Sequence, residues 1–490
     1  MPRQPPRLRL TAVALAVVLA GCSSAGDLAD DEPSEQPTSP SRAAPTPEPP
    51  DIAQVERATP WPQRPVVDLR FDASQGLETI RGTERVRFVA EQRVCELVFR
   101  LWANKPALVS GGTELTVDRV LVGRRPVEPA FRAAGAPPST PGSLMTVPIP
   151  CLAQGRSVEA TVDFHFTLGT EVAERMGRGD EIAWFATAFP LLGWQRDRGW
   201  ATNPVVRQFG EMVSSEEFRL RRLDVVVPES YEVLGTGRSL GRLPGPRSGT
   251  AVERFQAESV RDVAVTVGEL EIVEHDTGDV RIRVGGPAAG TATPLDDWLG
   301  GQTDAIAELE EFLGEFPYPD LWVSILPDGP SGIEFPGAIQ YGDIGSSAPY
   351  LQNLIVHETA HMWFYGLVGN NQGTDPWLDE SWATYAEVRV AGPPPLDVPI
   401  PDAVEDRVGE SMVWYSQPHT VNHYGEGVYL QGGQMLFEAL ETVDPDVADA
   451  LLLNYVNANS HAIAGPDDVV EAFGPAPSIV AVMREYGAVD

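Results

Sequence analysis

The residues with the clearest chemical potential form one segment, His-Glu-Thr-Ala-His at positions 357–361. Positions four apart in a helix lie one turn apart on the same face, so the imidazoles of His357 and His361 can reach one tetrahedral Zn²⁺. Glu358 then lies beside the metal, where its carboxylate can take a proton from a zinc-bound water. Because the chain has only seven histidines, this spacing arises by chance in roughly one such sequence in a hundred. The segment therefore predicts a zinc centre rather than two helix-surface histidines.

A catalytic zinc needs a third protein ligand and an open fourth position. Glu380 lies 19 residues after His361, in a segment whose Pro376 suits the first turn of a second helix. A turn over 369–375 would bring that helix back beside the first, so Glu380 is the predicted third ligand. Glu387 follows on the same face, either as a hydrogen-bond partner of a ligand imidazole or as a solvent-facing acid.

Two stretches of different periodicity must position these residues. Before about residue 286, short alternating segments separated by Gly and Pro turns favour an all-β sandwich or saddle. Further along, the apolar spacing becomes helical, with a few short strands between residues 321 and 341. We therefore predict a multidomain α+β fold, in which an N-terminal β domain at 63–285 precedes a mainly helical domain at 286–490.

The N-terminus carries a processing signal. Three arginines within the first nine residues precede an uncharged stretch at 10–21, which is too short to span a bilayer. The stretch runs into Leu-Ala-Gly-Cys at 19–22, which resembles the lipobox of bacterial lipoproteins, with an ordinary secretory signal as the alternative. The resemblance implies a signal peptide at 1–21, a lipid on Cys22 and a location on the extracytoplasmic face of the cell membrane. The polar composition within 22–62 predicts a disordered tether.

Two cysteines remain beyond Cys22 in the predicted mature chain, namely Cys95 and Cys151. An exported protein meets an oxidising compartment, so a disulfide between them is plausible, with two free buried thiols as the alternative. Closing their separation of 56 residues would contribute about 4 kcal/mol in the chain-entropy description.

The net charge of −34 is distributed unevenly. Residues 291–490 hold three cationic side chains against 32 acidic ones, whereas the rest of the chain is nearly balanced. An acidic protein of this kind repels a phosphate backbone, so we expect no nucleic-acid partner. The acidic half is either a solvated surface or a field that attracts cationic ligands.

Further segments around the zinc motif resemble one family. His-Glu-x-x-His followed after 18 residues by Glu is similar to the gluzincin metallopeptidases. The Met-Trp-Phe that follows His361, the Trp-Leu-Asp-Glu at 377–380 and the Glu-Phe-Pro-Tyr-Pro at 315–319 resemble the aminopeptidase N family. The resemblance implies a β saddle followed by a thermolysin-like zinc peptidase domain. It also implies peptide substrates and one zinc per chain, held by His357, His361 and Glu380.

The family pattern also implies a substrate-binding strand. Ser-Gly-Ile-Glu-Phe at 331–335 occupies the place of the family's Gly-x-Met-Glu-Asn motif, although only the glutamate is kept literally and Ser331, Ile333 and Phe335 depart. By this resemblance, Gly332 belongs to the strand whose backbone aligns the peptide, and Glu334 binds the substrate α-amine. The alternative for Glu334 is a charge on an edge strand.

A tyrosine hydroxyl is the last functional group that the family implies. Tyr-Gly-Glu-Gly at 424–427 resembles the family's Tyr-x-Lys-Gly, with Glu426 in the place of the lysine. The resemblance implies that the Tyr424 hydroxyl stabilises the oxyanion, a task that an oriented O–H donor performs well. Tyr415 and Tyr429 compete for this role.

Two departures from the family pattern bear on specificity. Ala-Thr-Ala-Phe-Pro at 186–190 offers no carboxylate or amide where the family's β domain often supplies a second amine anchor. The chain also stops near the end of the expected catalytic domain, without the large helical domain of longer members. We expect a zinc metallopeptidase, favouring an aminopeptidase that acts on free N-termini. Internal cleavage at an open cleft, a non-peptide substrate, and a lipid-anchored binding module with a vestigial zinc site are the alternatives.

Overall fold

The structure, a computed structural model, describes the chain from residue 52 onward apart from short gaps. The predicted signal peptide, Cys22 and most of the predicted tether lie outside the described residues. Within the described part, no helix combines the length and the apolar character needed to cross a bilayer. The described ranges are 52–169, 175–179, 181–207, 215–327, 329, 331–346, 348, 350–392 and 399–490.

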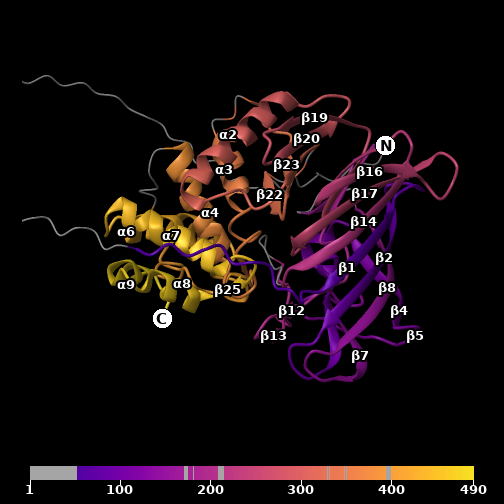
Figure 1. The fold of residues 1–490 in the computed structure, drawn as a ribbon, viewed down its shortest axis with the longest axis horizontal. Helices are drawn as coiled ribbons and strands as arrows, with labels where there is room; N and C mark the ends of the chain where they lie inside the picture. The colour runs from indigo at the N-terminus through magenta and orange to yellow at the C-terminus, as the bar shows by residue number, and fades with distance from the viewer. Residues whose placement is uncertain are drawn as a thin grey trace, which may run out of the picture. The chain divides into compact units, whose positions relative to one another are not determined.

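The first half of the described chain consists almost entirely of strands, as the alternation predicted. Its elements are β1 (Val66–Asp72), β2 (Thr79–Val89), β3 (Val94–Arg100), α1 (Pro106–Ser110), β4 (Glu114–Val122), β5 (Arg125–Pro126), β6 (Ala130–Arg132), β7 (Leu144–Leu152), β8 (Ser157–Thr167), β9 (Met176–Arg178), β10 (Ile182–Ala186), β11 (Leu191–Leu192), β12 (Trp194–Gln195), β13 (Gly199–Trp200), β14 (Phe218–Pro228), β15 (Glu232–Gly235), β16 (Arg238–Pro244), β17 (Thr250–Val260) and β18 (Ala264–Gly268). An eight-stranded sheet runs β16-β17-β14-β1-β2-β8-β4-β5, accompanied by the four-stranded sheets β15-β18-β10-β9 and β11-β3-β7-β6. Figure 1 shows these strands in indigo to magenta.

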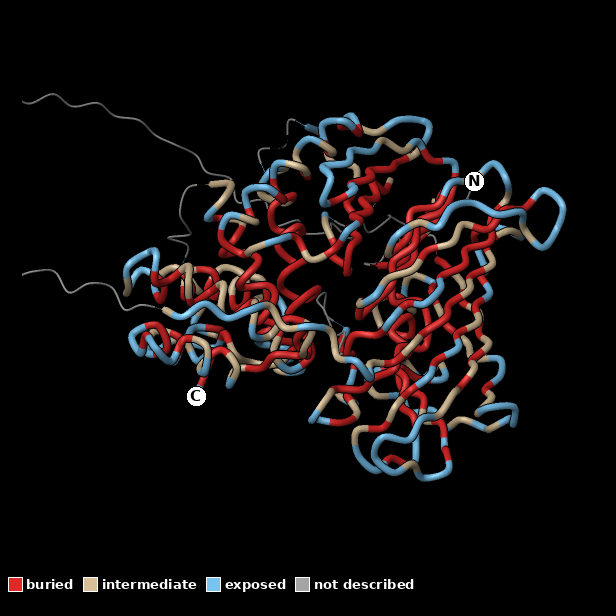
Figure 2. Tube along the Cα trace, viewed as in Figure 1, coloured by how far each residue is buried: buried red, intermediate tan, exposed pale blue. Residues whose placement is uncertain are grey.

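Strand β2 illustrates why these segments form a sheet with one buried face. Every second residue from Ile80 to Phe88 is buried, and the residues between them are exposed or half-buried. Because strand side chains alternate between the two faces of a sheet, one face of β2 packs into the core while the other meets solvent. Figure 2 shows the same alternation of buried and exposed positions along the neighbouring strands.

A disulfide joins two neighbouring strands of the β half. Cys95 of β3 and Cys151 of β7 are bonded, with their Cα atoms 4.0 Å apart. The two strands already pair antiparallel from Val94 to Arg100. The structure thus pairs the two cysteines as the sequence suggested, and the bond reinforces an existing strand register.

The second half combines a mixed sheet with helices, in agreement with the predicted mainly helical domain. Its elements are β19 (Leu270–Asp276), β20 (Arg281–Pro287), α2 (Leu295–Leu313), β21 (Asp320–Leu326), β22 (Gly332–Phe335), β23 (Ala338–Gly342), α3 (Leu351–Ala360), β24 (Gly369–Asn370), α4 (Trp377–Ala391), α5 (Met412–Tyr415), α6 (Gln431–Leu440), α7 (Pro445–Asn459), β25 (Ile463–Ala464), α8 (Pro466–Phe473) and α9 (Pro477–Glu485). The sheet runs β19-β20-β21-β23-β22, which leaves β22 at an edge. Because β20 pairs in parallel with β21, this sheet takes in strands that precede the boundary predicted at 285.

Helix α2 holds the sheet and the zinc-motif helix together. Its Trp298 stacks on Tyr341 of β23, with the ring centroids 4.8 Å apart. One turn further on, the Gln302 amide donates a hydrogen bond to the Thr359 hydroxyl of α3. Trp298 and Gln302 are both buried, so α2 packs against both α3 and the sheet. Figure 1 shows α2 and α3 lying next to each other beside this sheet.

The predicted tether ends earlier than residue 62. The backbone N–H of Val55 donates to Oδ1 of Asn454 at 2.8 Å, and the backbone N–H of Ala58 donates to the carbonyl of Asn457 at 2.9 Å. In Figure 1 the indigo segment accordingly runs along α7. This segment is ordered because distant asparagines on α7 satisfy its backbone groups, while its own composition provides few apolar contacts.

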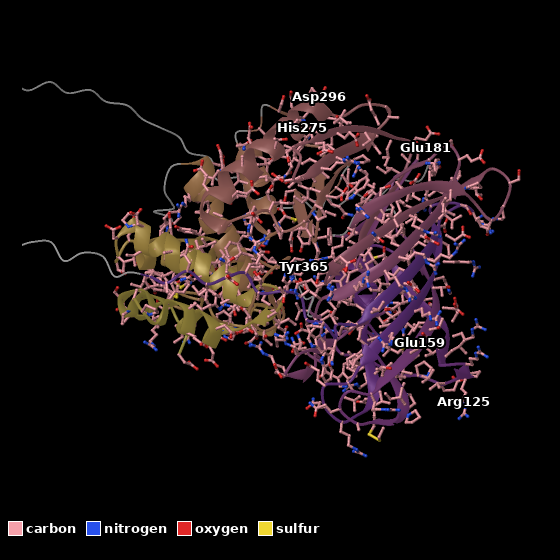
Figure 3. All side chains as sticks on the ribbon, in the orientation of Figure 1. Arg125, Glu159, Glu181, His275, Asp296 and Tyr365 are labelled. Atoms are coloured by element: carbon pink, nitrogen blue, oxygen red, sulfur yellow. A yellow bond between two sulfur atoms is a disulfide. The ribbon has the colours of Figure 1, made fainter. Side chains whose placement is uncertain are left out.

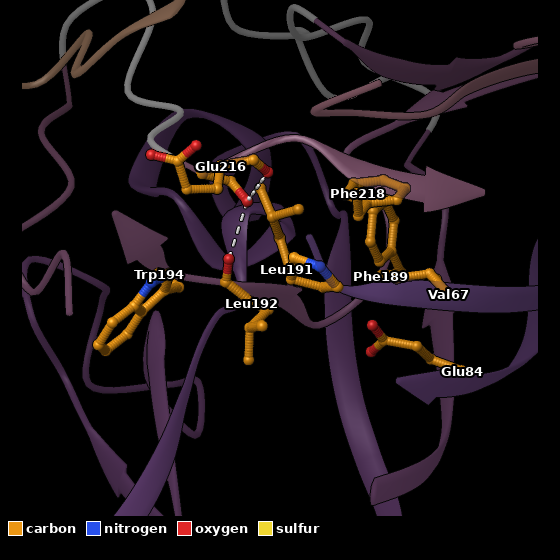
Figure 4. A pocket seen from close by; sticks show the side chains of 10 residues that line it. Val67, Glu84, Phe189, Leu191, Leu192, Trp194, Glu216 and Phe218 are labelled. Atoms are coloured by element: carbon orange, nitrogen blue, oxygen red, sulfur yellow. Dashed lines mark hydrogen bonds between the residues drawn. The ribbon is translucent and has the colours of Figure 1, made fainter. Parts of the chain in front are cut away.

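An unpaired carboxyl group is buried inside the β half. Glu84 of β2 is 1% exposed, and neither of its carboxylate oxygens has a hydrogen-bond partner among the described residues. Figure 4 shows the side chain directed into a small cavity that Phe189, Leu191 and Phe218 also line. Burial raises the pKa of this carboxyl well above its ordinary value. Glu84 therefore destabilises the fold at any pH at which the carboxyl is ionised in the unfolded chain.

Replacing Glu84 should flatten the pH dependence of stability. Above the ordinary glutamate pKa the unfolded chain loses the Glu84 proton while the folded chain keeps it, so the free energy of unfolding falls by up to about 1.4 kcal/mol per pH unit. Glu84→Gln should remove this slope, and its stability relative to wild type should increase as the pH rises. Urea unfolding across the mildly acidic to neutral range measures the effect, with Glu96→Gln at an exposed position of β3 as the control. A difference independent of pH would contradict the prediction.

Candidate active site

The structure brings the three predicted zinc ligands together at the contact between α3 and α4. Nε2 of His357 lies 3.2 Å from Nε2 of His361 and 3.3 Å from Oε2 of Glu380. The third separation, from His361 Nε2 to Glu380 Oε2, is 3.4 Å. Metal–ligand distances of about 2.0–2.1 Å around a tetrahedral Zn²⁺ require ligand atoms about 3.3–3.4 Å apart. The donor set and its spacing therefore fit one zinc ion.

Aromatic packing keeps the two ligand-bearing helices at this distance. Phe364, in the turn after α3, stacks on Trp382 of α4 with centroids 5.6 Å apart. Trp382 also stacks on Tyr455 of α7 and on Phe473 of α8, each at 5.8 Å. All four rings are fully buried. The position of Glu380, two residues before Trp382, is thus set by a core that includes helices far along the chain.

Glu387 lies behind one of the ligands. Its Oε2 is 3.1 Å from Nδ1 of His357, so the alternative of a purely solvent-facing acid does not hold. A carboxylate at Nδ1 makes that nitrogen the proton-bearing one and directs the lone pair of Nε2 toward the ligand cluster. Glu387 therefore orients His357 for metal binding.

The charges around the cluster favour a cation at its centre. Burial opposes ionisation of Glu380, yet the His361 and His357 imidazoles hold its pKa well below its usual range. Burial likewise opposes protonation of His361, but the Glu334 and Glu380 carboxylates raise its pKa to about 9. Neighbouring carboxylates thus stabilise positive charge at the imidazoles, which is the electrostatic condition for a bound Zn²⁺.

Glu358 and Glu334 face the same space beside the ligands. One ligand-type atom each from Glu334, Glu358 and His361 lies within 4.8 Å of the others. Glu334 is only 3% exposed, which excludes its alternative as a solvent-facing edge charge. Burial raises the pKa of Glu358 to about 8. At Gly332 a Cβ atom would overlap the Glu358 carboxylate, so the glycine makes room for this side chain.

Three tyrosines surround the ligands, and their hydroxyls have different partners. Tyr415 donates to the carbonyl of Arg407 at 2.7 Å, so its hydroxyl is occupied. The Tyr424 hydroxyl is buried and has no partner within the described chain. Tyr429 stacks on the ligand His357, with centroids 5.8 Å apart and planes 11° apart. Burial and the nearby Glu380 carboxylate raise the pKa of Tyr429 well above the ordinary value, so this hydroxyl keeps its proton close to the metal ligands.

The sequence contains a signal for Tyr429 that the first assignment missed. Tyr-Leu-Gln-Gly at 429–432 also fits Tyr-x-Lys-Gly, with a neutral Gln431 in the place of the lysine. Gly432 lies where α6 meets α4, because a Cβ there would overlap Ser381. A π-helical turn at Gly425–Leu430 connects the two candidate tyrosines. This geometry favours Tyr429 over Tyr424 as the oxyanion donor.

Paired substitutions separate the two tyrosines. Tyr429→Phe should lower kcat by ~10²–10³-fold, because it removes an oriented donor at the oxyanion position. Tyr424→Phe should lower kcat by less than about 10-fold, since Tyr429 and not Tyr424 stacks on the ligand His357. Steady-state kinetics and zinc content of both variants measure this difference. The reverse order of losses at unchanged zinc content would restore Tyr424 to the role.

The fold and the site together define the class of this protein, a zinc-dependent hydrolase with its metal ligands on two adjacent helices. Residues 310–486 match the family model described as Peptidase family M1 domain. The second half of the chain is therefore similar to the M1 peptidase domain.

Two curated relatives are similar to this part of the chain. Aminopeptidase Ey of Gallus gallus is 30% identical over 139 residues, which cover 26% of this chain and 14% of that protein. Aminopeptidase N of Lactococcus lactis subsp. cremoris is 36% identical over 138 residues, which cover 26% of this chain and 16% of that protein. The chain thus matches less than a fifth of the length of either relative.

Solved structures extend the similarity to the whole described fold. An M1 zinc metallopeptidase from Deinococcus radiodurans has a TM-score of 0.61 at 17% identity, covering 87% of this chain and 94% of that chain. A mutant of an M1 zinc metallopeptidase from that organism, bound to a Tyr-Ser-Ala substrate, has a TM-score of 0.63 at 16% identity, covering 87% of this chain and 95% of that chain. At these identities the comparison establishes the fold alone, which combines a β-rich first half with a mainly helical second half.

Proposed function

We propose that this protein is a zinc aminopeptidase that removes residues from the free N-termini of peptides. The observation that carries the proposal is the position of Glu334, a buried carboxylate within 4.8 Å of atoms of Glu358 and His361. A carboxylate at that distance from the reacting centre selects a substrate whose ammonium group lies next to the scissile bond. The names of the curated relatives support the same activity.

Strand β22 supplies the second element of substrate binding. It pairs with β23 on one side and lies at the end of its sheet. An extended peptide can add to such an edge through main-chain hydrogen bonds, which give affinity without side-chain selectivity. Because Glu334 belongs to this strand, a peptide aligned on β22 would present its N-terminus to that carboxylate.

The catalytic steps follow from the side chains at the site. A zinc ion held by His357, His361 and Glu380 would supply Lewis-acid polarisation of the carbonyl and a more acidic water. Glu358 accepts the proton of the attacking water and delivers it to the leaving amine. The Tyr429 hydroxyl donates a hydrogen bond to the carbonyl oxygen as negative charge develops there.

Comparison of one peptide in its free and N-acetylated forms tests the proposal. An aminopeptidase should show a higher kcat/KM for the free peptide, because acetylation removes the ammonium group that Glu334 would contact. A chelator should abolish both activities, which attributes them to the metal site. Equal values of kcat/KM for the two forms would refute the aminopeptidase function while leaving a zinc-dependent peptidase.

Internal cleavage is the second candidate function. Residues 186–190 contribute no carboxylate or amide to a second amine anchor, and a single anchor selects N-termini less strictly than two. Digestion of a long peptide with both ends blocked, followed by mass spectrometry, detects this activity directly. Glu358 and the zinc ligands make a catalytically inactive binding module the weaker alternative.

We further propose that the protein is anchored by lipid on Cys22 to the extracytoplasmic face of the cell membrane. The arginine-rich start, the short uncharged stretch at 10–21 and the Leu-Ala-Gly-Cys ending support this proposal. Between Cys22 and Ile52, where the described structure begins, 29 residues can span about 100 Å when fully extended. Metabolic labelling with a fatty acid should mark the wild type and not Cys22→Ser. Equal labelling of the two proteins would refute the anchor.

A further inference from the structure

Glu334, the proposed contact for the substrate α-amine, has a cationic neighbour from the β half. Nη2 of Arg175, which immediately precedes β9, lies 4.0 Å from Oε1 of Glu334. The guanidinium also lies over the ring of Phe335, 5.0 Å from its centroid. Phe335 stands where the motif Gly-x-Met-Glu-Asn has Asn, so a departure of this chain from that motif supplies the ring on which Arg175 rests.

Arg175 is itself held at the junction of the two halves. Its Nη1 lies 3.6 Å from Oδ2 of Asp262. The same oxygen accepts hydrogen bonds from the Thr187 hydroxyl at 2.5 Å and from the Tyr365 hydroxyl at 3.3 Å. Arg175 and Asp262 are both fully buried. Figure 3 places Tyr365 between the strands of the β half and the helices of the second half.

The backbone at this junction is strained in two places. Thr187 has a φ of 51° and Tyr365 a φ of 83°, a region that residues other than glycine seldom adopt, and β-branched ones least of all. Such conformations persist only where surrounding contacts determine them. Both side chains donate to Asp262, the residue that also pairs with Arg175. The geometry around Arg175 is therefore held from several segments of the chain.

We propose that Arg175 is a positioning residue, whose guanidinium holds the Glu334 carboxylate in place beside the reacting centre, so that the β half sets the preference for a free α-ammonium group. This inference rests on the aminopeptidase function proposed above. Residues 186–190 offer no carboxylate or amide as a second amine anchor. Selectivity for a free N-terminus then depends on Glu334 and on Arg175, which positions it.

Glu334 is a buried carboxylate with a second carboxylate beside it. A carboxylate that is 3% exposed, with the Glu358 carboxylate within 4.8 Å, has few contacts with water, so an ion pair with a buried cation can fix its position. Arg175 supplies that cation. At 4.0 Å the guanidinium attracts Glu334 but is too distant for a hydrogen bond. Oε1 of Glu334 has no hydrogen-bond partner among the described residues, so its lone pairs are open to a substrate ammonium group.

Steady-state kinetics with one peptide, free and N-acetylated, tests this role in the zinc-loaded protein. Arg175→Met should raise KM for the free peptide by about 10-fold or more, because the Glu334 carboxylate loses the ion-pair partner that holds it toward the substrate amine. The kcat for the free peptide and both constants for the acetylated peptide should stay within about 3-fold. Arg175→Lys keeps the charge and should give an intermediate KM, which also covers the case in which Arg175→Met does not fold.

Arg261→Met is the matched control for loss of a buried arginine at the same junction. Arg261 is 1% exposed and donates to the carbonyls of Gly366 at 3.1 Å and Ser215 at 3.0 Å. Its loss should lower thermal stability without changing the free-to-acetylated ratio of kcat/KM. An unchanged ratio in Arg175→Met, or equal losses on both peptides, would overturn the positioning role alone. A wild type that does not prefer the free peptide would overturn the aminopeptidase function, and the role of Arg175 with it.

Discussion

Glu358→Gln should leave one zinc per chain in place and lower kcat by at least ~10²-fold. Glutamine has the shape of glutamate, and Gly332 leaves space for either side chain. An amide cannot accept the proton of the attacking water, so the substitution removes the general base and leaves the ligands intact. The loss should appear in kcat more than in KM, because proton transfer belongs to the transition state and not to substrate binding.

The measurement for Glu358→Gln combines zinc analysis with single-turnover kinetics. Glu410→Gln serves as the control, since Glu410 is a surface acid 3.8 Å from Arg407 in an ion pair. The control should retain both zinc and activity. Full activity in Glu358→Gln at full zinc content would show that another group accepts the proton, and the assignment of Glu358 as the base would fail.

His361→Ala should remove most of the bound zinc and with it the activity. The remaining ligands, His357 and Glu380, leave the ion undercoordinated, and structural and catalytic zinc sites use at least three protein ligands. Loss of a hydrogen-bond partner behind a ligand weakens metal binding by roughly 10–100-fold. Glu387→Gln should therefore fall in that range, and His361→Ala should exceed it.

Competition with a chelator of known affinity ranks the variants by zinc affinity. His423→Ala is the control, because His423 lies in the same half with its Nδ1 3.6 Å from Glu426 and takes no part in the ligand cluster. It should hold zinc as tightly as wild type. Stoichiometric, tightly bound zinc in His361→Ala would refute this ligand set.

The sequence by itself determined the chemistry of the metal site. The spacing of His357 and His361 is a property of one helix, so any fold that keeps this helix places both imidazoles on one face. Glu380 could be predicted as the third ligand for a related reason, because a short turn between two helices brings the second helix back beside the first. The change from alternating to helical periodicity likewise identified a β half followed by a mainly helical half.

Where two segments carried the same local signal, the sequence could not choose between them. Tyr-Gly-Glu-Gly at 424–427 and Tyr-Leu-Gln-Gly at 429–432 both fit the family pattern. The choice depends on which hydroxyl reaches the ligands. Tyr424 precedes the π-helical turn at Gly425–Leu430 and Tyr429 lies within it, so the local backbone of each differs from an ordinary helix. The end of the tether could not be predicted from local sequence either, because residues 53–58 are ordered by asparagines about 400 positions further along the chain.

Only the tertiary structure decided what surrounds Glu334, the proposed contact for the substrate amine. Arg175, Thr187, Asp262 and Glu334 come from separate segments, and no periodicity or spacing links them. Their meeting depends on how the β half packs against the helices, which a large set of contacts between distant residues determines jointly. Local patterns report neighbours within a helical turn or a strand pair. The charge balance at Glu334 is set by residues that become neighbours only after both halves have folded.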